Sequence, residues 1–219
     1  MIWDWEYAID VLPALAEASL VTLAATFWGF FFALIIGLVL ALLRRSQIWL
    51  IRASTGFFVE FVRSTPLLVQ LYLLYFGLPQ IGITMTPFTV GVIGLAVHVG
   101  AYISEVYRAG LDNVPAGQLE AATALNFDSY RRMMFIILPQ AIPPIIPALD
   151  NYLVLMFKDT SLLSAIAVVE MLQLAKILGS ESFRFLEPMT IVGVFFIVMS
   201  LLAASGIRYV EARVGRGST

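Results

Sequence analysis

The sequence contains no cysteine and few charged residues. Only 13% of its 219 residues are charged, whereas a soluble domain carries roughly 25%. The absence of cysteine excludes a disulfide framework, a thiolate nucleophile and a cysteine zinc site. The net charge of −2 offers no basic face for nucleic acid. In contrast, 60% of the residues are hydrophobic, which excludes a disordered chain and predicts an integral membrane protein.

Five apolar segments are long enough to cross a bilayer, which takes about 20 residues. They cover residues 18–43, 57–78, 87–107, 141–167 and 189–207. Prolines in the fourth segment, and Thr65-Pro66 in the second, are expected to bend their helices. No internal repeat is visible. We therefore predict one all-α transmembrane domain of about five helices over residues 1–219.

The basic residues predict how these helices are oriented. The first seventeen residues contain four acidic residues and no Lys or Arg, the reverse of a signal peptide. With the N-terminus outside, nine of the 13 basic residues lie on the inner side and two on the outer side. Cytoplasmic loops are enriched in Lys and Arg. The N-terminus is therefore predicted outside and the C-terminus in the cytoplasm.

The inner loop between the third and fourth segments, residues 108–140, carries the most specific motif. Residues 116–125 favour a short helix, and Asn126 suits the left-handed residue that often ends one. Asp128 or Ser129 can cap a second helix. We expect a helix–turn–helix whose small side chains allow close approach by another protein. The alternative is an ordinary surface helix pair that joins two spans.

This loop resembles the cytoplasmic EAA loop of ABC-importer permeases. The resemblance rests on the EAA sequence at 120–122, the turn at Asn126 and the hydrophobic-Leu-Pro ending at 136–139, although the family usually has Gly where this chain has Asn126. The stretches FVRSTPLLVQLYLLYFGLP, EVYRAGLDNVPAGQLEAATALN and FKDTSLLSAI resemble the polar-amino-acid branch, the histidine/glutamine/arginine type. Nearly the whole chain is covered. Within this branch the ALN loop, NYLVLMFKDTSLLSAI and FRFLEP look most similar to permeases for ectoine and hydroxyectoine.

The resemblance implies a multi-pass permease of the bacterial inner (cytoplasmic) membrane that takes up ectoine or hydroxyectoine. The alternative substrate is a polar amino acid such as glutamine, arginine or histidine. It also implies two ATPase subunits, a second permease (identical or related) that completes a dimer, and an extracytoplasmic solute-binding protein. The residues implied to couple transport to the ATPase are Gly117, Glu120, Ala121, Ala122, Asn126, Leu138 and Pro139.

This chain itself has no GxxxxGK[ST] loop to cradle nucleotide phosphates. We therefore expect no cofactor on it, with ATP and magnesium bound by the ATPase. An intramembrane enzyme is disfavoured, because no serine nucleophile motif or cluster of metal ligands is evident. The single histidine, His98, is expected to form a helix–helix hydrogen bond. A stand-alone channel or carrier is the alternative from another functional class.

Charged side chains within a membrane span cost free energy, so each is expected to have a structural or functional role. Glu60 and Arg63 are three residues apart and share a helix face. We interpret them as a structural ion pair rather than a ligand site, and interpret Glu105 and Arg108 in the same way.

Four consecutive polar residues, Lys158, Asp159, Thr160 and Ser161, interrupt the end of the fourth segment. They predict a broken or unwound stretch that lines a cavity. Opposite charges there could bind both ends of a zwitterion, and the resemblance places the substrate pathway at this depth. The alternative is a buried ion pair that fixes helix packing.

Overall fold

The computed structural model describes residues 3–214, and the side chains of residues 3–203. Every regular element in the described part is helical, which confirms the all-α prediction. The α-helices are α1 (Trp5–Arg44), α2 (Trp49–Arg63), α3 (Leu67–Tyr72), α4 (Pro87–Asp112), α5 (Ala116–Ala124), α6 (Ser129–Arg132), α7 (Leu138–Asp159), α8 (Met171–Ser182) and α9 (Leu186–Val214). Two π-helical turns, η1 (Leu73–Gly77) and η3 (Met133–Ile137), and two 3₁₀ segments, η2 (Leu78–Ile81) and η4 (Thr160–Ile166), extend or join them.

Within the described part of the chain, four helical stretches are long and apolar enough to span a membrane. They are α1, α4, residues 129–166 and residues 186–203, and α2 with residues 67–81 forms a fifth candidate that is bent by 104°. The second predicted segment, 57–78, is therefore not one straight helix. The fourth begins twelve residues earlier than predicted, at 129 rather than 141, because η3 joins α6 directly to α7.

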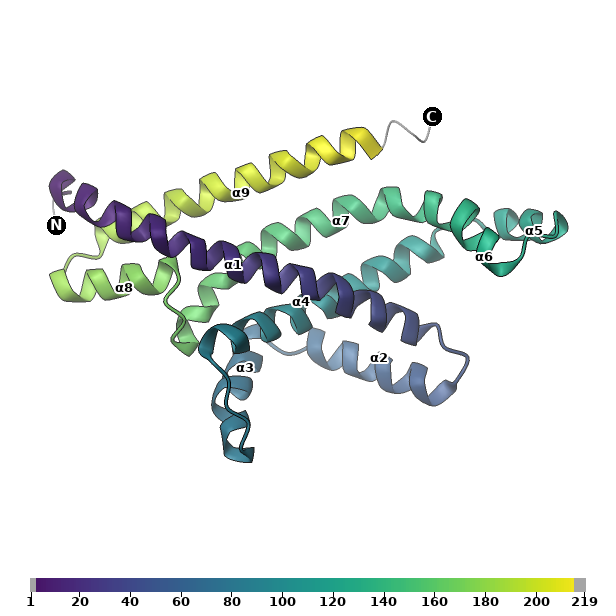
Figure 1. Cartoon of the computed structure of the whole chain (residues 1–219), viewed down its shortest axis with the longest axis horizontal. Coiled ribbons are helices and arrows are strands. Elements are labelled where there is room, and N and C mark those ends of the chain that lie inside the picture. The colour runs from purple at the N-terminus through teal and green to yellow at the C-terminus, as the bar shows by residue number, and fades with distance from the viewer. Residues whose placement is uncertain (1–2, 215–219) are drawn as a thin grey trace.

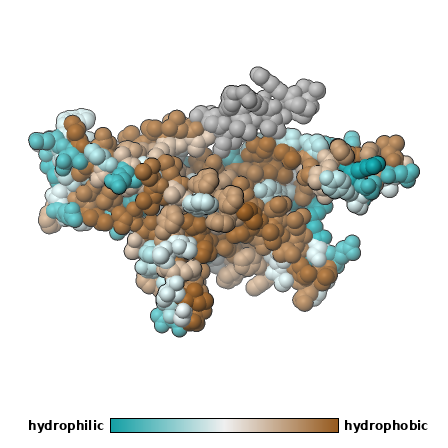
Figure 2. Space-filling view, in the orientation of Figure 1, coloured by the Kyte–Doolittle hydropathy of each residue, from teal (hydrophilic) through white to brown (hydrophobic). Residues whose placement is uncertain are grey.

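The long helices α1, α4, α7 and α9 run roughly along the long axis of the molecule (Figure 1). The N-terminal end of α1 and helix α8 lie at one end, and α5 with α6 lies at the other. We refer to these as the outer and cytoplasmic ends, following the predicted orientation. Figure 2 shows hydrophobic residues over the middle of the visible face and hydrophilic residues concentrated at both ends, as a bilayer requires.

Close packing of α1 on α4 depends on small residues. A Cβ added at Gly37 would lie 2.7 Å from Cγ2 of Ile103 and 3.0 Å from the carbonyl oxygen of Gly100. Small residues let helix backbones approach in membranes, where packing rather than the hydrophobic effect drives association. This pair of helices provides the frame on which the other elements pack.

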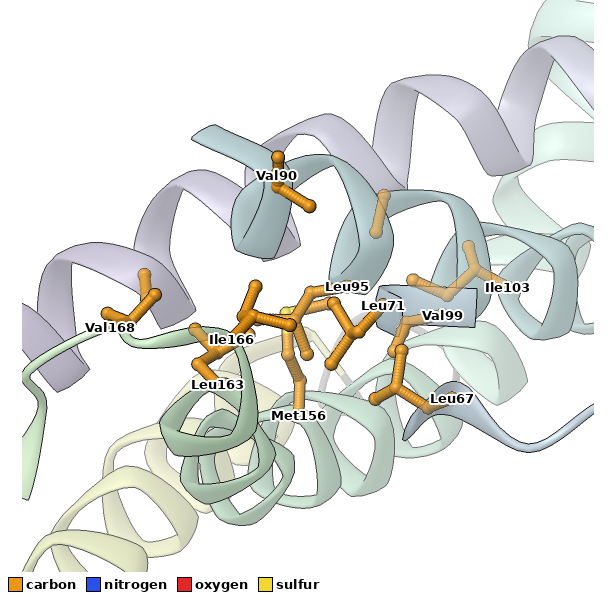
Figure 3. Packing of buried hydrophobic residues seen from close by; sticks show 12 residues of the cluster. Leu67, Leu71, Val90, Leu95, Val99, Ile103, Met156, Leu163, Ile166 and Val168 are labelled. Atoms are coloured by element: carbon orange, nitrogen blue, oxygen red, sulfur yellow. The ribbon is translucent and has the colours of Figure 1, made fainter. Parts of the chain in front are cut away.

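The largest buried cluster joins α1, α3, α4, α7 and η4. Figure 3 shows Leu71 of α3 and Leu95 of α4 together with Met156 of α7 and Leu163 of η4, all four fully buried. This cluster anchors the short α3 to the bundle, while the rest of the segment from 67 to 81 projects away from it (Figure 1).

Candidate functional site

The predicted helix–turn–helix forms at the cytoplasmic end, and its turn has a defined geometry. Helix α5 ends in a Schellman motif: Phe127 N donates to the carbonyl of Ala122, and Asn126 N donates to that of Thr123, each at 3.0 Å. Asn126 is left-handed, with φ of 56°. The side chain of Asp128 then accepts from Arg131 N at 2.7 Å and caps α6. The structure confirms the predicted turn residue and cap.

The loop presents most of its surface to solvent. Gly117, Glu120 and Ala121 are exposed, whereas Ala122 is buried at the inner side of α5. Arg132 of α6 donates to Thr123 Oγ1 at 3.2 Å and so joins the two helices across the turn. This bond and the turn at Asn126 fix how α5 lies against α6.

The second helix of the loop differs from the expectation. Helix α6 has only four residues and continues through η3 into α7, so the predicted loop end at residue 140 already lies within the long helix. Leu138 is half-buried and Pro139 is exposed at the first turn of α7. The loop is therefore joined to α7 by continuous helix.

The four polar residues at the end of α7 do not form an unwound segment. The helix tightens from α to 3₁₀ at Thr160 and ends at Ala167, whose φ is 62°. Thr160 Oγ1 donates to the carbonyl of Phe157 at 2.6 Å, and Ser161 Oγ donates to that of Lys158 at 2.8 Å. The expectation of a broken helix was wrong, because these two hydroxyls bond within their own turn and the helical hydrogen bonding continues.

Two of the four residues line a cavity. Lys158 and Ser161 border a cavity of about 560 Å³ between the end of α7, α8 and α9, whose other walls are mainly apolar. Lys158 is exposed, Asp159 is half-buried and Thr160 is fully buried. No ion pair joins Lys158 to Asp159 within the described residues. The cavity thus has one cationic side chain in an apolar setting.

Glu60 and Arg63 belong to a larger cluster of charges at the cytoplasmic end. Arg63 lies 3.7 Å from Glu60 and 3.7 Å from Glu105. Glu105 also pairs with Arg44 of α1 and, at 2.7 Å, with Arg108. Glu60 is 72% exposed, whereas Glu105 is 21% exposed. The carboxylate of Glu105 is therefore the centre of the cluster and joins α1, α2 and α4.

Sequence reasoning missed two features of the tertiary structure. The first is the role of Arg44, which was read only as an inner-side charge. The second is Glu170, which is fully buried in the outer loop and caps α8 through bonds of 2.8 Å from Leu172 N and Gln173 N. Burial raises the pKa of Glu170 to about 7. A Glu directly before a helix was the only sequence signal for this cap.

The predicted sites lie at three separate places. The coupling loop is at the cytoplasmic end, Lys158 and Ser161 are toward the outer end of α7, and the charge cluster surrounds Glu105. Among the described residues no group of three or more His, Asp or Glu is arranged to hold a metal ion.

Comparisons with known proteins agree on the family. Residues 33–216 match the family described as "Binding-protein-dependent transport system inner membrane component". A probable amino-acid ABC transporter permease protein, y4tG, of Sinorhizobium fredii is 42% identical over 95% of this chain and 90% of its own length. A putative glutamine transport system permease protein, GlnP, of Rickettsia bellii is 35% identical over 96% of this chain and 98% of its own.

Solved structures share the fold. The crystal structure of an amino acid ABC transporter with histidines matches with a TM-score of 0.92 at 35% identity, covering 97% of this chain and 100% of that one. The inward-facing MetNI methionine ABC transporter matches at 0.71 with 18% identity, covering 97% and 99% of the two chains. The chain therefore belongs to the binding-protein-dependent transport system inner membrane components, as the multi-pass, non-catalytic permease subunit of an ABC importer that works with an ATPase and a binding protein.

Proposed function

We propose that this permease imports a polar amino acid, of the glutamine, histidine or arginine class. The observation that carries the proposal is the full-length match to the amino-acid transporter structure at 35% identity. The relatives reported above are named for amino acids or glutamine. The resemblance to ectoine permeases seen in the sequence receives no support from them, so ectoine uptake is the competing outcome of the test.

The coupling loop is the element through which the ATPase would drive the cycle. Glu120 and Ala121 lie exposed on α5 and would dock on the ATPase together with Gly117, while the buried Ala122 and the turn at Asn126 would hold their support. Leu138 and Pro139 would pass the movement into α7. Two ATPase subunits, carrying ATP and magnesium, would close and open beneath the loops of two permeases.

A second permease would complete the passage. Large apolar side chains are exposed along α2 and the segment after it, among them Phe57 at 75%, Leu73 at 64% and Phe76 at 57%. Either lipid or a second permease would cover such a face. Lys158 would attract the carboxylate of the substrate at the outer cavity, with Ser161 beside it, and Asp159 and Thr160 would shape the end of α7.

Uptake by cells tests the substrate class. Labelled glutamine, histidine, arginine and ectoine are supplied to a strain that lacks this gene, with and without the gene restored on a plasmid. We expect the restored strain to regain uptake of at least one of the three amino acids. If only ectoine uptake returns, the amino-acid proposal is wrong while the permease class stands.

Two variants test the assigned residues in the assembled importer. Glu120→Lys combined with Ala121→Asp should abolish substrate-stimulated ATP hydrolysis, whereas Glu181→Lys, an exposed charge reversal on α8, should leave it intact. Lys158→Gln should raise the KM for uptake, because it removes the cation from the cavity, without changing basal ATP hydrolysis. Stimulation that survives the loop variant, or an unchanged KM, would remove the corresponding residue from its role.

A further inference from the structure

The bend between α2 and α3 leaves backbone carbonyls without their helical partners. Pro66 has no N–H, so the carbonyl of Val62 loses its normal donor, and the carbonyl of Arg63 loses its donor because the chain turns. Each unsatisfied carbonyl is costly inside a membrane. Side chains rather than the backbone reach these groups, and the single hydroxyl hydrogen of Thr65 is shared between the carbonyl oxygens of Phe61 at 3.0 Å and Val62 at 3.2 Å.

Gln70 of α3 supplies most of the remaining hydrogen bonds. Its Nε2 lies 2.8 Å from the carbonyl oxygen of Val62, 3.2 Å from that of Thr65 and 2.6 Å from Thr65 Oγ1. Because carbonyls only accept hydrogen bonds, the amide nitrogen must face the bend and the amide oxygen must face away from it. The orientation of the Gln70 amide is therefore determined by its surroundings.

The amide oxygen of Gln70 meets His98 of α4. The distance from Oε1 to His98 Nδ1 is 3.1 Å. The oxygen can only accept, so Nδ1 must carry a proton in this structure, and the bond persists when the ring gains a second proton. This is the helix–helix hydrogen bond that was expected for the single histidine, and it connects the bend to α4.

Tyr102, one turn further along α4, holds the other side of the bend. Its hydroxyl donates to the carbonyl of Arg63 at 3.1 Å. The guanidinium of Arg63 lies over the same ring, 5.2 Å from its centroid. Gln70 and Tyr102 thus join both sides of the bend to neighbouring helices, and we call them the elbow latch.

The segment beyond the bend, residues 67–81, is attached to the bundle at few points. Leu71 packs so closely on α4 that a Cβ at Gly94 would lie 2.5 Å from Leu71 Cδ2. Further along, Leu73 and Phe76 are exposed, and the helix widens into the π-helical η1. Such π-turns are frequent at functional sites. Backbone hydrogen bonds lie on either side of the bend: Ser64 N donates to Glu60 at the end of α2, and Val69 N and Gln70 N donate to Pro66 at the start of α3. The bond from Gln70 Nε2 to the carbonyl of Val62 spans the bend, so the angle depends mainly on side chains.

We propose that Gln70 and Tyr102 are positioning residues of the transport cycle: the elbow latch sets the angle between α2 and α3, and its release lets the segment 67–81 move as access changes sides. The proposal rests on the importer function argued above. Side-chain hydrogen bonds can be exchanged for water as a passage fills, without unwinding either helix. A bend held in this way can take up two angles at low cost, which is what a gating element requires.

The first test uses Tyr102→Phe, which removes one hydroxyl and keeps the ring beneath Arg63. Tyr152→Phe is the matched control, because its ring lies 5.8 Å from that of Tyr102 and its hydroxyl makes no bond to the bend. Spin labels at the exposed positions 57 and 76 report the angle in the assembled complex in nanodiscs. With Tyr102→Phe we expect a second distance population, enlarged about fivefold over wild type, and a similar fall in uptake per complex.

A second variant protects the test against a folding defect. Gln70→Met keeps the length of the side chain and removes all bonds of the amide, and Gln173→Met on α8, away from the bend and from the loop 108–140, is its control. Each complex is checked for assembly by size-exclusion chromatography, and Tyr102→Phe decides alone if Gln70→Met fails to assemble. Unchanged distances together with wild-type uptake in assembled Tyr102→Phe complexes would overturn the proposal. If the spin-label distances change in Tyr102→Phe but even the wild-type complex transports no amino acid, the proposed function is refuted instead.

Discussion

The buried carboxyl of Glu170 makes stability depend on pH in a direction opposite to that of most carboxylates. Its pKa is raised from 4.5 to about 7 because burial penalises the charged form more than the two backbone N–H bonds and nearby Lys176 favour it. Between these two values the folded protein holds a proton that the unfolded chain has lost. The contribution of this group to stability is therefore full below pH 4.5 and declines as the pH rises through about 7.

The size of the effect follows from the two pKa values. One pKa unit corresponds to 1.36 kcal/mol, so ionising Glu170 in the folded state costs about 3 kcal/mol. Glu170→Gln cannot ionise and keeps one acceptor oxygen for the α8 cap, so it loses about 1 kcal/mol of hydrogen bonding. We expect the variant to be less stable than wild type by about 1 kcal/mol at pH 4 and more stable by about 2 kcal/mol at pH 8.

Thermal unfolding at different pH values measures where the stability difference between Glu170→Gln and wild type changes sign. The fluorescence of the four tryptophans is followed in detergent at intervals from pH 4 to 8.5. For a chain of this length each kcal/mol moves Tm by roughly 2–4 °C, so the variant should gain about 4–8 °C over wild type at pH 8. Glu181→Gln, exposed on the same helix, serves as the control. Parallel Tm curves for wild type and Glu170→Gln would refute the reasoning.

Three further predictions concern packing, the loop turn and the charge cluster. Gly37→Ala should destabilise the chain by about 1–3 kcal/mol through overlap with α4, whereas Gly193→Ala, with open space around it, should not lower Tm. Asn126→Gly should preserve coupled ATP hydrolysis, and Asn126→Val should reduce it, because a β-branched residue in the left-handed region costs about 1–2 kcal/mol. Glu105→Gln should lower stability by about 1–2 kcal/mol, since Arg44 loses its carboxylate partner while Arg63 and Arg108 keep Glu60 and Asp112, and partial exposure screens the cluster. Glu60→Gln, 72% exposed, should change stability by less than 0.5 kcal/mol in the same denaturation assay.

The geometry of the loop around Asn126 could be predicted from the sequence because it is local. The left-handed conformation of Asn126 and the cap by Asp128 depend on hydrogen bonds that span five residues or fewer. Residue preferences at such positions reflect the same short-range interactions. The membrane class and the apolar segments could be predicted equally well, since they depend on the composition of single stretches of the sequence.

The end of α7 could not be predicted in the same way. Adjacent opposite charges suggested an unwound helix, yet Thr160 and Ser161 satisfy their hydroxyls within the turn and the helix only tightens. The bend at Pro66 was expected, but its angle of 104° was not. That angle depends on Gln70 and Tyr102 reaching carbonyls from α3 and α4, and on Leu71 finding room at Gly94.

The sequence by itself determined that this chain is an all-helical membrane protein, which segments are apolar, and where the turn at Asn126 and the cap at Asp128 lie. Those properties follow from composition and from contacts between near neighbours in the chain. Only the tertiary structure decided that Glu105 gathers arginines from three helices, that Glu170 is buried, and how α2 meets α3. The physical reason is distance along the chain. Arg44 and Glu105 are 61 residues apart, so no preference of a residue for its local conformation predicts that their side chains are in contact.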